Sequence, residues 1–270
     1  MFPMHAWLPT AHPVAPAPAS AVLSAIIVKG GVLALIRSVY YIAGANHIVG
    51  TWVQYTWLGL AMFTVFMGSM LAYNEKVLKK RLAYSSVSQA SYIMLGLAIL
   101  NPVALTGSLL HVLFHAFIKT ALFLTAGAIN SVSTYCTRVD QLRGIGKAMP
   151  VIMWCYTFVS LALIGIPPAS GFVSKWYLAT GILDSGMPVI SWLAPVILLV
   201  SALLTAGYLL PITIQGFLPG ANFDYDHLVK RKPTWKMTLP LLILAACALL
   251  TGMFPAGLIE YLSGIARTLL

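Results

Sequence analysis

The sequence predicts an all-α fold: one polytopic transmembrane bundle of about seven spanning helices, with one helix broken near residues 165–168. Composition is the first observation behind this prediction, because 60% of the residues are hydrophobic and only 8% are charged, against about 25% charged in soluble domains. The mean hydropathy of +0.89 agrees with it. The second observation is a series of long apolar runs, and the third is the gathering of basic residues in alternate loops. Together they exclude a soluble globular domain.

The apolar runs define the expected spans. A spanning helix needs about 20 mostly apolar residues, and the candidate spans fall at approximately 19–43, 51–73, 85–100, 103–129, 149–182, 189–217 and 237–263. In the fifth span, Pro167 and Pro168 remove backbone donors and clash with the preceding turn, so we expect a broken helix there. Residues 1–18 contain five prolines and are expected to form an irregular lead-in with room for only a short helical piece. We expect residues 1–270 to form a single transmembrane domain.

Basic residues divide the loops into two classes. With seven spans, the loops at 74–84, 130–148 and 218–236 share one face of the membrane. The eleven basic residues of these loops are Lys76, Lys79, Lys80, Arg81, Arg138, Arg143, Lys147, Lys230, Arg231, Lys232 and Lys236. The opposite face has only Arg267. The positive-inside rule then predicts a cytoplasmic N-terminus and an external C-terminus, in the inner or plasma membrane of the cell.

Ionisable residues within the predicted spans are all basic. The lysines and arginines there are Lys29, Arg37, Lys119 and Lys175. The six acids lie in loops or near helix ends, at Glu75, Asp140, Asp184, Asp224, Asp226 and Glu260. Because ionisable side chains are costly in the bilayer core, those found there are functional-site candidates by default.

The run LLHVLFHAFIKTALFL at 109–124 adds two histidines to this set. His111, His115 and Lys119 are four residues apart, so on a helix they form one stripe with a rise of roughly 6 Å per step. Histidine exchanges protons near neutral pH, and burial makes lysine do so because it disfavours the charged form. Lys29 and Lys175 lie on two other helices, one of them broken, and transporters place ion sites at such breaks. The set predicts a path for protons.

Other interpretations of these residues stay open. Either histidine alone is compatible with simple packing, and Lys29 or Lys175 alone could snorkel to the interface. For Arg37, which lies close to a helix end, snorkelling is the favoured interpretation. We expect no metal or cofactor site, since no phosphate loop, haem signature or nucleophile elbow occurs and Cys136, Cys155 and Cys247 lack ligand spacing. Nucleic acid is not an expected partner.

Five motifs resemble a known family. They are HAWLPTAH at 5–12, VKGG at 28–31, LKKRLAYSSVSQASY at 78–92, HVLFHAFIKTALFLTAG at 111–127 and GIPPASGFVSKW at 165–176. In this order, they are similar to motifs of the antiporter-like subunits shared by respiratory complex I, Mrp-type cation/proton antiporters and membrane-bound hydrogenases. The resemblance implies a proton-translocating or cation/proton antiporting subunit of a multi-subunit complex, with other membrane subunits and the lipid bilayer as partners. Any enzymatic role is that of a translocase component without a redox centre of its own, and whether sodium moves as well as protons stays open.

The resemblance also implies roles for individual residues. Lys29 matches the central lysine on the helix after the family's first broken helix, and His111 and His115 match the connecting histidines, with Lys119 one turn further. Lys175 matches the gating lysine or glutamate of the second broken helix. The resemblance therefore implies proton transfer through these five residues.

The resemblance covers the C-terminal half of such a subunit. Full-length members have two inverted repeats, with a glutamate–lysine pair in the first, whereas this chain is expected to start inside the first broken helix. The partners therefore include a separate N-terminal half as one option. An alternative is a truncated or split structural subunit that conducts nothing. A seven-helix receptor, the third interpretation, would leave the broken helix and the buried lysines unexplained.

Overall fold

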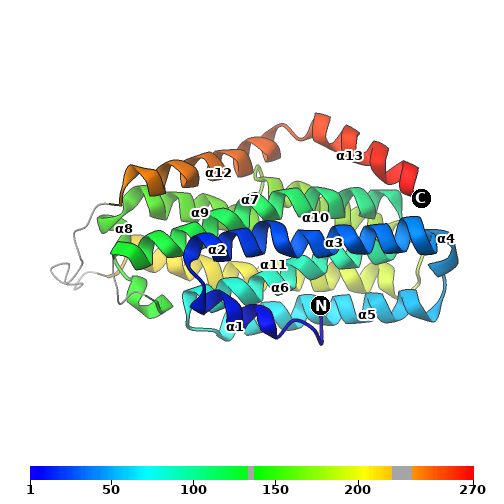
Figure 1. Ribbon diagram of the computed structural model, residues 1–270, viewed down its shortest axis with the longest axis horizontal. Helices are drawn as coiled ribbons and strands as arrows, with labels where there is room; N and C mark the ends of the chain where they lie inside the picture. Colours follow the sequence, from blue (N-terminus) through cyan, green and yellow to red (C-terminus); the bar gives the residue numbers. More distant parts are fainter. Residues whose placement is uncertain (133–136, 221–232) are drawn as a thin grey trace.

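The computed structural model describes residues 1–132, 137–220 and 233–270, and these are helical apart from short connections and one β-bridge between Val77 and Arg138. Six helical stretches of this part are long and apolar enough to cross a membrane: Ala17–Ala43, Trp52–Asn74, Leu78–Ile99, Pro102–Ser131, Ile190–Phe217 and Trp235–Met253. A seventh path consists of α9 (Pro150–Ile164) and α10 (Ser170–Leu183). The stretches lie side by side along one long axis (Figure 1). The predicted all-α bundle with a broken helix is confirmed.

The chain begins inside the bundle. Phe2 donates its backbone N–H to Thr64 Oγ1 at 3.0 Å, and Thr64 lies in the middle of α5 (Trp52–Asn74). The start of the chain therefore lies at mid-length of the bundle (Figure 1). The reason is that the lead-in runs alongside α5 and α6 before the chain continues into α2.

The lead-in is more regular than expected. It contains α1 (Trp7–Val14), which ends before Pro16. The following stretch is continuous and consists of α2 (Ala17–Val22), η1 (Leu23–Ile27), α3 (Val28–Ile36) and η2 (Arg37–Ala43), where η1 and η2 are π-helical, and a short α4 (Ala45–Ile48) follows. Pro9 and Pro18 lie in the first turns of α1 and α2, where proline is well tolerated, and Pro13 lies in the last turn of α1, which ends one residue later.

The centre of the bundle is formed by α6 (Leu78–Ile99) and α7 (Pro102–Val132). Most of α6 is buried although it is rich in serine, because its polar side chains bond to neighbouring helices. Ser88, for example, meets Ser69 at 2.8 Å and Ser201 at 3.3 Å. Helix α6 starts at Leu78 and not near residue 85, since the lysines and arginine that lower its hydropathy are good helix formers.

The break between α9 and α10 lies at residues 165–169. Gly165 ends α9 with a φ of 94°, a left-handed conformation that glycine adopts at little cost. Helix α12 (Trp235–Met253) crosses the break at Gly252, where a Cβ atom would collide with the backbone of Ala169 and Ser170. This close approach holds the break against the outer layer of the bundle.

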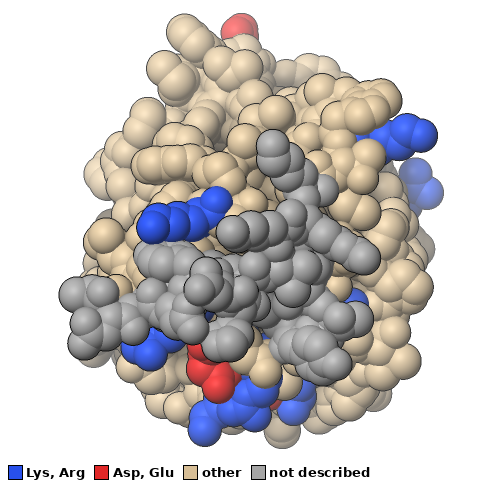
Figure 2. All heavy atoms as spheres, turned by 90° about the vertical axis from the view of Figure 1, so that its left-hand side faces the viewer, with Lys and Arg blue, Asp and Glu red and all other residues tan. Residues whose placement is uncertain are grey.

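The outer helices complete the fold. They are α11 (Ile190–Phe217), α12, and α13 (Ala256–Leu269), so the expected span at 237–263 is two helices separated near Pro255. Two short helices, η3 (Val139–Leu142) and α8 (Ile145–Ala148), lie at one end of the bundle. Lysines and arginines surround this end (Figure 2), which we call the basic end. Several residues of the charge and cysteine analysis lie outside the described residues: Cys136, Asp224, Asp226, Lys230, Arg231 and Lys232.

Candidate functional site

Lys29 and His115 form the central contact of the site. Lys29 lies on α3 just after the π-helical segment η1, and only 9% of it is exposed. Its Nζ lies 2.7 Å from Nδ1 of His115 on α7 and also bonds to the carbonyl oxygen of Ser24. Ser24 Oγ in turn lies 2.9 Å from Ser86 Oγ of α6. The lysine head group therefore points into the bundle, which excludes snorkelling for Lys29.

His111 lies one turn before His115 on α7. Its Nδ1 is 2.9 Å from Ser174 Oγ of α10, and its Nε2 is 3.1 Å from Gln89 Oε1 of α6. Both ring nitrogens of His111 thus have polar partners, one on α10 and one on α6. The two imidazole rings are stacked with centroids 5.8 Å apart. His111 is thereby held between three helices.

Lys119 continues the stripe toward the basic end. It is fully buried, and its Nζ donates to the carbonyl oxygen of Leu82 at 3.0 Å and to Ser85 Oγ, both on α6. A buried cation is tolerated only when polar partners replace its hydration shell. Helix α6 supplies these partners from its serine-rich first half.

Lys175 lies at the break of the seventh path. Its Nζ donates to the carbonyl oxygens of Leu163 and Ile164 at 2.7 and 2.8 Å. These carbonyls end α9, so they lack helical partners and carry its partial negative charge. The same Nζ lies 5.3 Å from the ring centroid of Tyr92, a distance at which a cation–π attraction operates. The broken helix itself thus provides the anionic environment for this lysine.

Tyr92 lies between His111 and Lys175. Its ring stacks on His111 with centroids 5.6 Å apart, and its hydroxyl donates to the carbonyl oxygen of Leu198 at 2.9 Å. All five residues singled out in the sequence therefore lie in one row inside the bundle. In order, this buried row consists of Lys119, His115 with Lys29, His111, Tyr92 and Lys175. Among the described residues, no carboxylate contacts it.

Sequence reasoning missed the partners of the row. Gln89, Ser85 and Ser86 lie in the motif LAYSSVSQASY, where polar residues within an apolar span were the available signal. Tyr92 ends the same motif and Ser174 lies in GIPPASGFVSKW, but single residues of these types are common in membrane helices and did not stand out. His115 Nε2 has no hydrogen-bond partner in the described part of the chain although it is buried. Simple satisfied packing therefore does not account for His115.

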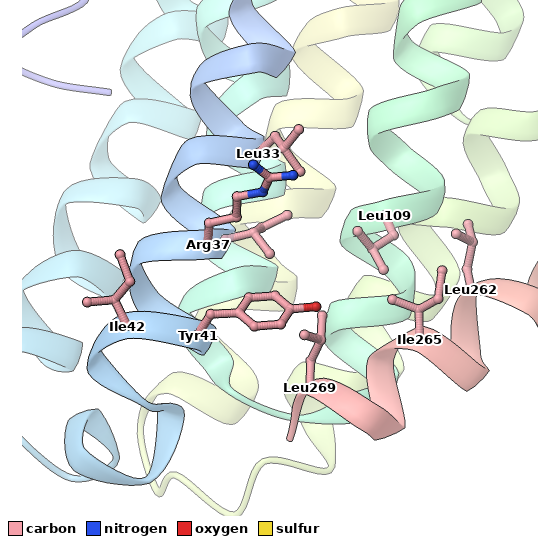
Figure 3. A pocket seen from close by; sticks show the side chains of 9 residues that line it. Leu33, Arg37, Tyr41, Ile42, Leu109, Leu262, Ile265 and Leu269 are labelled. Carbon is pink, nitrogen blue, oxygen red and sulfur yellow. The ribbon is translucent and has the colours of Figure 1, made fainter.

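Arg37 lies apart from the row. It is exposed and lines a lateral pocket of about 710 Å³ between α3, α7 and α13. Figure 3 shows Arg37 on the α3 side of this pocket, with Leu109 of α7 and Leu269 of α13 across from it. Within the described residues, no hydrogen bond or ion pair joins Arg37 to the buried row, so we do not assign it to the candidate site.

The sequence and the fold of this chain are similar to those of known membrane proteins. The family described as NADH:quinone oxidoreductase/Mrp antiporter, TM, matches residues 1–205. This chain belongs to that family. Among its members, the NADH-quinone oxidoreductase subunit N of Desulforudis audaxviator is 37% identical over 96% of this chain, and F(420)H(2) dehydrogenase subunit N of Methanosarcina mazei is 32% identical over 96%. A chain in the Mrp complex from Dietzia sp. superposes over 98% of this chain with a TM-score of 0.87 and 26% identity.

The match covers only part of each family member. The alignments span 53% and 52% of the two relatives and 55% of the Dietzia chain, so this chain spans about half the length of the curated relatives it matches. Family membership and the six long apolar helices make it a membrane-embedded, multi-pass protein. The resemblance drawn from the five motifs is therefore confirmed.

Proposed function

We propose that this chain transfers protons through its buried row, as part of a membrane subunit of a redox-driven or cation/proton antiporting complex. The observation that carries the proposal is the contact between Lys29 Nζ and His115 Nδ1, which places two proton carriers from different helices at hydrogen-bond distance. The names of the relatives, oxidoreductase subunits and an Mrp complex, support the kind of assembly. The chain holds the transfer path, and the chemistry that drives it takes place elsewhere in the complex.

The Lys29–His115 pair can hold one transferable proton. When Lys29 is an ammonium ion, it donates to Nδ1, and His115 carries its own proton on Nε2. Transfer of the shared proton leaves a neutral Lys29 and an imidazolium at His115. Release of the Nε2 proton then completes one step, and the ring has passed a proton from one nitrogen to the other. The unpartnered Nε2 is the atom from which that proton leaves.

Repulsion between like charges couples protonation of one residue in the row to protonation of the next. The row contains three lysines and two histidines, and in the described part of the chain no carboxylate neutralises them. In a low-dielectric interior, a charge gained at one site therefore opposes a charge at the next. Protonation of Lys29 favours release from its neighbours, and the α9 carbonyls offer Lys175 a place where a proton is stabilised. Such coupling moves a proton along the row in one direction when protonation is more favourable at one end than at the other.

We propose protons, and not sodium, as the ion that moves through this row. Hard metal cations prefer oxygen ligands, usually carboxylates and carbonyls. The row instead presents amine and imidazole nitrogens that repel a cation when protonated. Sodium transport by the complete complex would need a different path.

We place the basic end on the cytoplasmic side of the inner or plasma membrane. The described lysines and arginines at this end follow the positive-inside rule, and the C-terminus lies at the opposite end of the bundle (Figure 1). The proposed partners are other membrane subunits of the complex and the segment that matches the remaining half of the relatives, whether on this or a separate polypeptide.

The test is proton pumping by the assembled complex carrying Lys29→Ala or Lys175→Ala. Each variant removes a proton carrier, so we expect pumping to fall by about tenfold or more, while membrane insertion and assembly persist. Lys236→Ala is the matched control, because this lysine is exposed at the basic end. Unchanged pumping in both variants would refute the proposal and support a structural subunit that conducts nothing.

A further inference from the structure

His12 on α1 is a buried histidine that the row does not include. None of its surface is exposed, and within residues 1–132, 137–220 and 233–270 neither ring nitrogen has a hydrogen-bond partner. Buried polar groups are nearly always paired, and each exception calls for an explanation. The backbone around the ring is well anchored, since Ser20 Oγ donates to the His12 carbonyl oxygen at 3.1 Å and Lys79 Nζ to that of Ala15 at 2.9 Å. The ring is therefore held in place while its nitrogens stay unpaired.

The position of His12 extends the row by one step. Phe123 lies four residues after Lys119 on α7 and continues the stripe of His111, His115 and Lys119. The His12 ring stacks flat on Phe123, with centroids 4.4 Å apart and an interplanar angle of 14°. Lys79 of α6 also lies near this end of α1, since its Nζ donates to the carbonyl oxygen of Ala15, three residues after His12. His12 thus lies between the last lysine of the row and the basic end.

A small cavity adjoins this position at the basic end. It has a volume of about 50 Å³, and its lining includes Pro13, next to His12, together with Lys79, Ala126 and Asn130. A liquid-like water molecule takes up roughly 30 Å³, so the cavity is of water size. Lys79 and Asn130 provide polar groups that such a water needs. The cavity reaches Pro13, the residue next to His12, although the imidazole itself is not part of its lining.

We propose that His12 is the proton-uptake relay between the basic end and Lys119. One ring nitrogen takes a proton from water in the cavity, and the other nitrogen releases its proton through water to neutral Lys119. One proton enters and one leaves, so His12 is neutral before and after the step and no other reactant is needed. Because protonated Lys119 repels a charge on His12, uptake proceeds only after Lys119 has passed its proton on. This inference rests on the proposed function and assigns its uptake site.

The alternative role for His12 is packing against Phe123, and two variants separate the roles. His12→Phe keeps a flat ring on Phe123 and removes both nitrogens, whereas His12→Gln keeps a polar side chain that cannot carry a proton. If His12 is a relay, both variants should slow proton pumping by about tenfold or more. If His12 only packs against Phe123, His12→Phe should pump protons normally. The control is His47→Phe, because His47 is exposed on α4 at the opposite end of the bundle.

The experiment measures the initial rate of proton uptake by vesicles containing the assembled complex, in H₂O and in D₂O. The expected result is a slow rate with an enlarged solvent isotope effect in both His12 variants, because proton uptake becomes limiting. Normal uptake in His12→Phe would overturn the inference, as would failure of both variants to assemble, which would assign a packing role. Lys175→Ala, measured in parallel, keeps the two proposals apart. If it abolishes pumping while His12→Phe pumps normally, only the uptake assignment fails; if it pumps normally as well, the proposed function fails.

Discussion

Lys29 Nζ and His115 Nδ1 lie 2.7 Å apart although 86 positions separate the two residues in the chain. The contact joins α3 to α7 and brings two ionisable groups within hydrogen-bond distance. On α7, His111 and Lys119 flank this pair at helical spacing. The stripe on one helix thus becomes part of a row of contacts that connects several helices.

A double-mutant cycle tests whether the pair acts as one unit. Lys29→Ala and His115→Phe should each slow pumping strongly, and the double variant should be hardly slower than the worse single one. The physical reason is that either change removes the shared proton, and effects of contacting residues are not additive. The measurement is the initial pumping rate of the four forms of the assembled complex. Fully multiplicative losses would show that the two residues work independently.

Tyr92 should act through its ring and not through its hydroxyl. Tyr92→Phe keeps the stacking on His111 and the ring face near Lys175, and loses only the bond to Leu198, worth about 1 kcal/mol of stability. Tyr92→Leu loses the ring. We expect near-normal pumping for Phe and a several-fold loss for Leu, with thermal unfolding as the stability measurement. A severe pumping defect in Tyr92→Phe would instead assign the proton path to the hydroxyl.

Gln89 should matter because it orients His111. Gln89→Leu leaves His111 Nε2 buried without its hydrogen-bond partner on α6, which costs about 1–3 kcal/mol and frees the ring to turn. We expect slower pumping, and recovery with Gln89→Glu, which retains an acceptor. The matched control is Gln54→Leu, since Gln54 is equally buried but bonds to the Ala98 carbonyl oxygen outside the row. It should lower the melting temperature and leave the pumping of the folded complex intact; equal pumping defects in the two leucine variants would contradict an orienting role.

Gly252 should be intolerant of any side chain. An added Cβ would collide with the backbone at the break between α9 and α10, and overpacking of this kind costs about 1–3 kcal/mol. Gly252→Ala should therefore lower the melting temperature of the purified complex and weaken pumping, because Lys175 depends on the geometry of the break. Gly257→Ala on α13 is the control, since nothing lies within 4 Å of a Cβ there. Equal melting temperatures would show that the crossing is loosely packed.

The positions of the helices show how much of the fold can be predicted from neighbouring residues in the sequence. Spans were predictable because bilayer thickness sets the length of an apolar run, and Pro167 and Pro168 marked the break because proline lacks a donor. The start of α6 was misplaced because the charged residues near Lys79 and Lys80 end an apolar run without ending a helix. Helix α1 forms in spite of its prolines, because Pro9 lies in its first turn and Pro13 in its last.

The sequence by itself determined the bundle, the family and the stripe of His111, His115 and Lys119, because hydropathy and helical period are properties of neighbouring residues. Only the tertiary structure decided which atoms meet. The pairing of Lys29 with His115, the α9 carbonyls around Lys175 and the burial of His12 against Phe123 depend on how separate helices pack. The physical reason is that a hydrogen bond acts over a short distance and needs two heavy atoms within about 3.2 Å. Residues far apart in the sequence come so close only when their helices pack together.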